Sequence, residues 1–188
     1  MTTVKLGSTG IVTNKNGFGA LPIQRISFDA AAELINEAYL NGITYFDTAR
    51  AYSDSEEKLA YAFKKYNIPR DKIYIASKTM ATDAAGLWKD LETSLKNLET
   101  DYIDVYQLHN PAFCPVPGGE DGLYDACLEA KEKGLIRHIA ITNHRMAVAE
   151  EAVESGLYEL LQYPFNYLIS EREIKLAARC KELNIGFV

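Results

Sequence analysis

The first βα turn of the chain reads GFGALPIQR, residues 17–25, and it opens what the pattern predicts to be the first βα unit. A Rossmann dinucleotide-binding turn requires the spacing GxGxxG, whose third glycine allows close packing of helix and strand. Here Gly17 and Gly19 are present and the third glycine is missing. Repeated βα units build either a doubly wound open sheet or a (β/α)8 barrel, and this turn favours the barrel.

Around this turn, apolar runs with the length and residue content of buried parallel strands recur every 24 to 32 residues. Helical patterns separate them, with no linker between. The repeat predicts an α/β protein, an incomplete (β/α)8 TIM barrel of about six βα units and the start of a seventh strand. We expect residues 1–188 to form a single domain, incomplete at its C-terminal end. The predicted strands begin near Gly17, Ile43, Ile73, Asp104, Ile136, Leu161 and Ile185.

Two of the predicted helices have clear signals. The segment 84–98 is helical by its leucine spacing, and a second helix starts after Ser27 as N-cap and ends at Asn41 and Gly42. Glu56 and Glu57 fit the first turn of a third helix, where the helix dipole favours negative charge. The inward-facing residues expected are Leu87, Leu91, Leu95 and Leu98 in the first helix and Leu34, Ile35, Ala38 and Tyr39 in the second.

Two segments outside the repeat also have predicted roles. Val4–Leu6 and Ile11–Thr13 flank the turn residues GSTG, which predicts an N-terminal β-hairpin that closes the bottom of the barrel. Residues 110–120, NPAFCPVPGGE, contain three prolines and two glycines and are expected to form a loop near the strand that ends at His109.

Size, composition and charge limit the classes of partner. A chain of 188 residues with 47% hydrophobic content can bury a substantial core. Its net charge of -6, without a cluster of Lys and Arg, argues against nucleic acid or an anionic membrane surface and favours a small-molecule partner. No stretch has the roughly 20 apolar residues of a membrane span. The N-terminus lacks an apolar signal region, so we expect a cytoplasmic protein.

The three cysteines, Cys114, Cys127 and Cys180, are widely spaced and include no CxxC pair. They support neither a disulfide framework nor a zinc site, and no metal site is expected. Cys127 and Cys180 fall on helical patterns and are expected to be packing residues. Cys114, in the loop after His109, either borders the substrate pocket or is a loop thiol without a role.

Polar side chains that can take part in acid–base chemistry stand at or just after the ends of three consecutive predicted strands, in ITYFDTARAY, IYIASKT and VYQLHN. Each alone has a structural explanation, such as a helix cap for Asp47 or a satisfied core position for His109. Parallel strands place their carboxyl ends on one rim, so Asp47, Tyr52, Lys78 and His109 are expected to meet there. An acid, a phenol, an amine and an imidazole together indicate an active site.

The stretches FDTARAYSDSE, LHNP, GLIRHIAITNH and LQYPFNYL, with the Lys78 strand in the expected order, closely resemble the aldo-keto reductases along the whole chain. The turn GFGALPIQR with YSDSEEK and the long loop after LHNP is most similar to bacterial members with a C-terminal ferredoxin-like segment. The chain departs from the family pattern at Ser53, where glycine is common, and at Ala140 and Thr142 in a strand usually written IGVSN.

The resemblance implies reduction of aldehydes or ketones to alcohols by hydride transfer from NADPH, because no side chain can donate hydride. Tyr52 would be the general acid and His109 would orient the carbonyl oxygen. Lys78, held by Asp47, would lower the pKa of the phenol. The positions that hold the nicotinamide carboxamide in the family are Thr142, Asn143 and Gln162, although these polar strand-end residues could equally satisfy loop backbone groups.

The resemblance also implies that the sequence stops in the seventh strand, before the basic segment that holds the cofactor's 2′-phosphate. Unpaired first and last strands would favour self-association. Alternative functions are a non-catalytic, nicotinamide-binding or regulatory module on the same scaffold, or an inactive fragment. The quartet favours the enzyme, since a binding module has no need for Tyr52 and Lys78 together.

Overall fold

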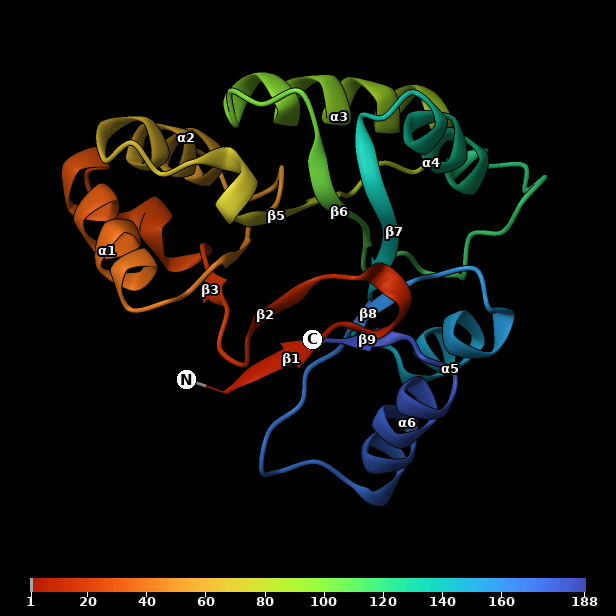
Figure 1. Ribbon diagram of the computed structural model, residues 1–188. Helices are drawn as coiled ribbons and strands as arrows, with labels where there is room; N and C mark the ends of the chain where they lie inside the picture. The colour runs from red at the N-terminus through yellow and green to blue at the C-terminus, as the bar shows by residue number, and fades with distance from the viewer. Residues whose placement is uncertain (1) are drawn as a thin grey trace.

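The computed structural model describes residues 2–188. Within them, seven parallel strands form one sheet in chain order, and the sheet curls into a half-barrel (Figure 1). This confirms the α/β class and the incomplete barrel, and each predicted strand is present within a few residues of its expected start. The strands are β3 Phe18–Gly19, β4 Tyr45–Asp47, β5 Tyr74–Thr79, β6 Ile103–His109, β7 Ile136–Thr142, β8 Leu160–Gln162 and β9 Gly186–Phe187.

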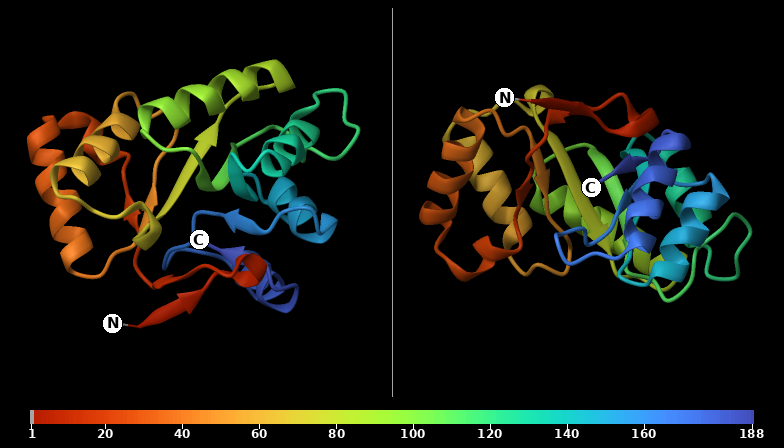
Figure 2. Two further views of the ribbon diagram at one scale, coloured as in Figure 1. Left: turned by 45° about the horizontal axis from the view of Figure 1, so that its top comes forward. Right: turned by 90° about the horizontal axis from the view of Figure 1, so that it is seen from below.

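The helices follow one another around the outside of the curled sheet, and their arc is open between α1 and α6 (Figures 1 and 2). These helices connect successive strands, because parallel neighbouring strands require a crossover connection. None of them is long and apolar enough to cross a membrane within the described part of the chain. Their bounds are α1 Phe28–Leu40, α2 Ser55–Lys65, α3 Ala84–Asn97, α4 Leu123–Glu132, α5 Met146–Ser155 and α6 Glu171–Glu182, with short 3-10 turns at Gly7–Thr9, Pro22–Arg25 and Arg70–Lys72.

The helix predictions are confirmed except for one residue. Ser27 caps α1 by accepting a hydrogen bond from the backbone of Ala30, and the predicted leucines of α3 pack on the main core. Leu34 was expected to face inward, but it is 54% exposed. Its neighbour Ile35 is fully buried, and one residue turns an α-helix by about 100°. The sheet therefore contacts α1 on the side next to Leu34.

The predicted hairpin is confirmed, with β1 Thr3–Lys5 antiparallel to β2 Val12–Asn14. Leu6 and Ile11 at its turn are buried in a second core cluster inside the sheet. Their partners there lie on the sheet strands: Tyr45, Ala76, Val105, Ala140 and Leu160. The hairpin thus closes the N-terminal end of the barrel interior, which leaves the opposite end for a site.

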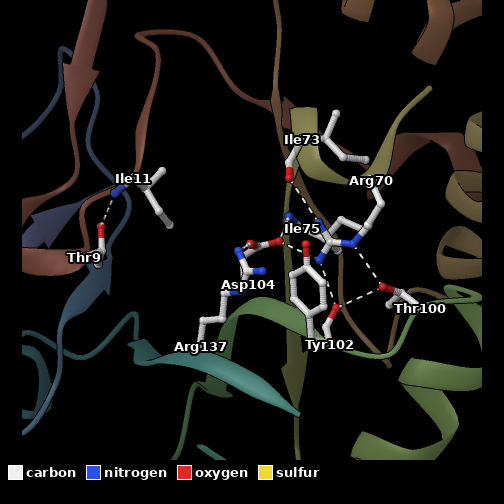
Figure 3. A network of polar contacts seen from close by, with 9 residues as sticks. All are labelled: Thr9, Ile11, Arg70, Ile73, Ile75, Thr100, Tyr102, Asp104 and Arg137. Atoms are coloured by element: carbon white, nitrogen blue, oxygen red, sulfur yellow. Dashed lines mark hydrogen bonds and ion pairs between the residues drawn. The ribbon is translucent and has the colours of Figure 1, made fainter. Parts of the chain in front are cut away.

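A buried ionic network stabilises this closed end (Figure 3). Asp104 is 1% exposed and accepts hydrogen bonds from Arg70 at 2.6 Å, Arg137 at 3.2 Å and the backbone of Ile75 at 2.9 Å. Both guanidinium carbons lie within 4.0 Å of the ring centroid of Tyr102. Because a buried carboxylate needs several donors, this arrangement joins β5, β6 and β7 without leaving an unpaired charge.

The segment 110–120 is a loop with no helix or strand, as predicted. Its position relative to the core was not predicted. Cys114 is buried in the main apolar cluster, and burial raises the pKa of its thiol to about 11. The neighbouring carbonyl of Pro115 accepts a 2.6 Å hydrogen bond from the Tyr158 hydroxyl. Cys114 therefore packs in the core, as Cys127 and Cys180 do, which agrees with the interpretation of a loop thiol without a chemical role.

Candidate active site

The strand-end residues predicted from the sequence lie on one rim of the sheet. Asp47 ends β4, Lys78 is next to last in β5, His109 ends β6, Thr142 ends β7 and Gln162 ends β8. The parallel register explains this convergence, since it pairs Lys78 with Gln107 and His109 with Thr142. Tyr52 follows in the loop between β4 and α2.

Asp47 and Lys78 form a buried ion pair. The Lys78 ammonium lies 2.6 Å from a carboxylate oxygen of Asp47 and donates to the carbonyl of Thr48 at 2.7 Å. The side chains are 2% and 13% exposed respectively. Burial lowers the pKa of Lys78 below its ordinary value, and the charge of Asp47 acts in the opposite direction. The expected holding of Lys78 by Asp47 is thus present in the geometry.

The Tyr52 ring lies beside both Lys78 and His109. The Lys78 ammonium is 5.2 Å from the ring centroid, and the imidazole of His109 meets the ring edge to face with centroids 5.9 Å apart. The pKa of Tyr52 is raised, first by burial and then by the charge of Asp47. This direction is opposite to the lowering expected from Lys78, because burial and the charge of Asp47 favour the neutral phenol.

His109 is a neutral imidazole near pH 7. Burial, and secondarily the charge of Lys78, lowers the pKa of its ring to about 4. Its Nδ1 atom is buried and has no hydrogen-bond partner among residues 2–188. A neutral imidazole carries one N–H donor and one acceptor, so it can donate a hydrogen bond to a carbonyl oxygen without adding charge.

Two glutamine amides complete the environment of Asp47. Gln107 donates to one carboxylate oxygen at 3.1 Å and Gln162 to the other at 3.4 Å. The amide oxygens of both glutamines are buried and have no partner among the described residues. Gln107 was not predicted, although it stands two positions before His109 on the same strand and so points to the same face of the sheet.

The other two predicted cofactor residues, Thr142 and Asn143, lie at and just after the end of β7 and bond to neighbouring loops. Asn143 is fully buried, donates to the carbonyl of Pro111 at 2.8 Å and accepts from the backbone of Arg145 at 2.8 Å. These bonds organise the loop after β7. Thr142 is 5% exposed, and its carbonyl accepts a 2.7 Å bond from the backbone of Asn110.

Further functional features were missed or only partly predicted. Glu56 lies in the first turn of α2 as predicted, and its full burial and ion pair with Arg50 were not predicted. Ser53 has a φ of 41°, in the left-handed region where glycine is favoured. This explains physically why glycine suits the position after Tyr52. The serine at position 53, where the family commonly has glycine, was the sequence signal that could have indicated this backbone conformation.

A nicotinamide fits the donor and acceptor set at this rim. Its carboxamide carries two N–H donors, and the buried amide oxygen of Gln162 is an acceptor without a partner in the described chain. No comparable set of ligands for a metal ion is present, because residues 2–188 contain no group of three or more His, Cys, Asp or Glu side chains that could hold one.

Known proteins are similar to this chain in sequence and in fold. The sequence profile of the aldo/keto reductase family matches residues 13–188. Aldo-keto reductase YhdN of Bacillus subtilis is 29% identical over 98% of this chain and 60% of its own length. An NAD/NADP-dependent indole-3-acetaldehyde reductase of Schizosaccharomyces pombe is 31% identical over 65% of this chain and 43% of its own length.

A solved aldo/keto reductase of Brucella melitensis is 29% identical and superimposes with a TM-score of 0.79 over 99% of this chain and 70% of its own. The chain thus spans between 43% and 70% of the length of these relatives. Since the family profile covers nearly the whole chain, the protein belongs to the aldo/keto reductase family.

Proposed function

We propose that this protein reduces aldehydes or ketones to alcohols by hydride transfer from NADPH, with Tyr52 as general acid. The observation that carries the proposal is the contact of the Tyr52 ring with both Lys78 and His109 on the rim where Asp47 holds Lys78. A module that only binds nicotinamide has no need for a buried ion pair beside a protonated phenol.

Each residue of the cluster has a separate role at the carbonyl oxygen of the substrate. Tyr52 gives its proton to the oxygen as negative charge develops there, and the raised pKa keeps the phenol protonated until that point. Lys78, close to the ring, stabilises the phenolate that remains. Neutral His109 donates a hydrogen bond that orients the carbonyl. Asp47, Gln107 and Gln162 keep the ammonium in place through hydrogen bonds around one carboxylate.

Thr142, Asn143 and Gln162 would hold the nicotinamide at the carboxyl ends of β7 and β8. When bound, the reduced nicotinamide supplies the hydride. Gln162 would offer its amide oxygen, which has no hydrogen-bond partner among the described residues, while Asn143 fixes the loop that follows. The relative from Schizosaccharomyces pombe is named for use of NAD and NADP, which supports a nicotinamide cofactor here.

The loops at the catalytic end suit a carbonyl compound with an apolar substituent. Large apolar side chains on the loops after β3, β5 and β6 are 40% to 63% exposed. These are Leu21, Met80, Phe113 and Val116. The aldehyde in the name of the relative from Schizosaccharomyces pombe also combines an apolar ring with a carbonyl group.

The test is oxidation of NADPH in the presence of a panel of aromatic and aliphatic aldehydes, followed by the loss of reduced-nicotinamide absorbance. Tyr52→Phe should abolish nearly all turnover, because it removes the proton donor and keeps the ring. The matched control is Tyr102→Phe, which makes the same chemical change at the opposite end of the barrel. Equal rates for the two variants would refute the role of Tyr52.

A further inference from the structure

A buried carboxylate outside the proposed catalytic cluster joins three elements next to it. Glu56, in the first turn of α2, is fully buried. It accepts hydrogen bonds from the Ser77 hydroxyl of β5 at 2.7 Å and from the Asn97 amide of α3 at 3.3 Å, and it forms an ion pair with Arg50. Ser77 directly precedes Lys78, so Glu56 lies behind the strand that carries the ammonium.

Through Arg50, this carboxylate reaches the loop that carries Tyr52. The backbone N–H of Arg50 donates to the carbonyl of Lys78 at 3.0 Å, and its guanidinium donates to the carbonyl of Ser53 at 3.4 Å. Arg50 therefore contacts the loop on both sides of Tyr52: it lies two residues before the tyrosine and its guanidinium binds Ser53, the residue after it. Ser53 has the left-handed φ described above, a conformation that needs support from its surroundings.

The phenol of Tyr52 depends on this loop for its position. Its hydroxyl makes no hydrogen bond to any of residues 2–188, and its backbone bonds are confined to the loop itself. They run from the Tyr52 N–H to Ala49 at 3.0 Å and from the Ser55 N–H to the Tyr52 carbonyl at 2.9 Å. Thr48 ties the start of the loop to β5, through bonds to Ala76 at 2.8 Å and from the Lys78 ammonium at 2.7 Å. Closer to Tyr52 the tie to β5 is the backbone bond of Arg50, whose side chain is held by Glu56.

We propose that Glu56 is a positioning residue for the reductase reaction: by holding Arg50, it sets the loop that places the Tyr52 phenol beside Lys78 and His109. The kinetic part of this inference rests on the proposed function, whereas the structural part does not. The carboxylate itself is behind the sheet strand and contacts no residue that would touch the substrate.

The experiment compares Glu56→Gln and Arg50→Met with the wild type. Glutamine can still accept from Ser77, but it cannot pair with the guanidinium. Hydrogen exchange followed by mass spectrometry should show faster exchange in residues 48–55, by about tenfold or more, because local opening determines exchange. In NADPH-dependent aldehyde reduction, kcat should fall by roughly 10- to 100-fold while KM stays within about twofold, as expected for a misplaced catalytic group.

Asp104→Asn is the matched control, since it also removes one buried carboxylate that binds arginines, at the opposite end of the barrel (Figure 3). It should leave the exchange of residues 48–55 and kcat within about twofold of wild type. The double variant Glu56→Gln/Arg50→Met should be no slower than either single variant, because the two residues act through one contact.

Unchanged exchange in residues 48–55 for Glu56→Gln would overturn the proposal, and so would an equal change in the Asp104→Asn control. Faster exchange with an unaltered kcat would overturn it as well, because the loop would then not govern the phenol. If the wild type reduces no aldehyde in the panel, the proposed function fails separately, and the exchange data alone decide whether Glu56 fixes the loop.

Discussion

Replacing Lys78 by methionine removes the ammonium from the most deeply buried ion pair of the rim while keeping a side chain of similar length. In the wild type, Lys78 satisfies both Asp47 at 2.6 Å and the carbonyl of Thr48 at 2.7 Å. The variant leaves these two oxygens without that donor, and the carboxylate stays largely buried because its side chain is only 13% exposed.

The free-energy cost can be worked out from these contacts. Removing one member of a buried ion pair typically destabilises by about 3–5 kcal/mol. The lower end applies here, because Asp47 retains hydrogen bonds from Gln107 and Gln162. With a urea m-value of about 2 kcal/mol per molar, a loss of about 3 kcal/mol lowers the unfolding midpoint by about 1.5 M.

The assay is urea unfolding at pH 7 followed by circular dichroism, at two protein concentrations so that association is detected. Adding Asp47→Asn to Lys78→Met should recover part of the lost stability, since it removes the uncompensated charge. A midpoint shift for Lys78→Met below about 0.3 M, or a double variant less stable than the single one, would refute the account of this pair.

Other predictions concern the neighbouring residues. Tyr52→Phe should leave the unfolding midpoint nearly unchanged and reduce NADPH-dependent carbonyl reduction by roughly 10²- to 10⁴-fold, and activity within twofold of wild type would exclude the phenol as acid. The folded-state pKa of His109, about 4, lies below its ordinary value of 6.5, so the unfolded chain binds the proton more readily and stability should fall as pH drops from 6.5 towards 4. His109→Gln should flatten that part of the pH–stability curve, and an identical slope would contradict the assigned burial. Ser53→Gly should raise thermal stability slightly, by about 0.5 kcal/mol, because glycine adopts the left-handed φ of 41° without a Cβ clash, while a drop of more than 1 kcal/mol would show that the hydrogen bond to Gln24 matters more.

By itself, the sequence determined the order of the strands and the rim on which the polar residues meet. These depend on local patterns, because an apolar run of strand length followed by a helical period builds a βα unit wherever it occurs. The convergence of Asp47, Lys78 and His109 follows from the same rule, since parallel strands place their carboxyl ends together. The hairpin and the loop after His109 could also be predicted from local patterns, because turn residues mark both segments.

Which side chains are buried and how the polar groups pair could not be read from local patterns. Leu34 and Glu56 have the right residue types for their helices, yet the packing angle of each helix exposes the first and buries the second. The pKa of Tyr52 is raised by burial and by the charge of Asp47, and Gln107 joins the cluster through a carboxylate 60 positions away in the chain. Burial and electrostatic interaction are sums over neighbours from several elements, so they become defined only when the sheet has curled and brought those elements together.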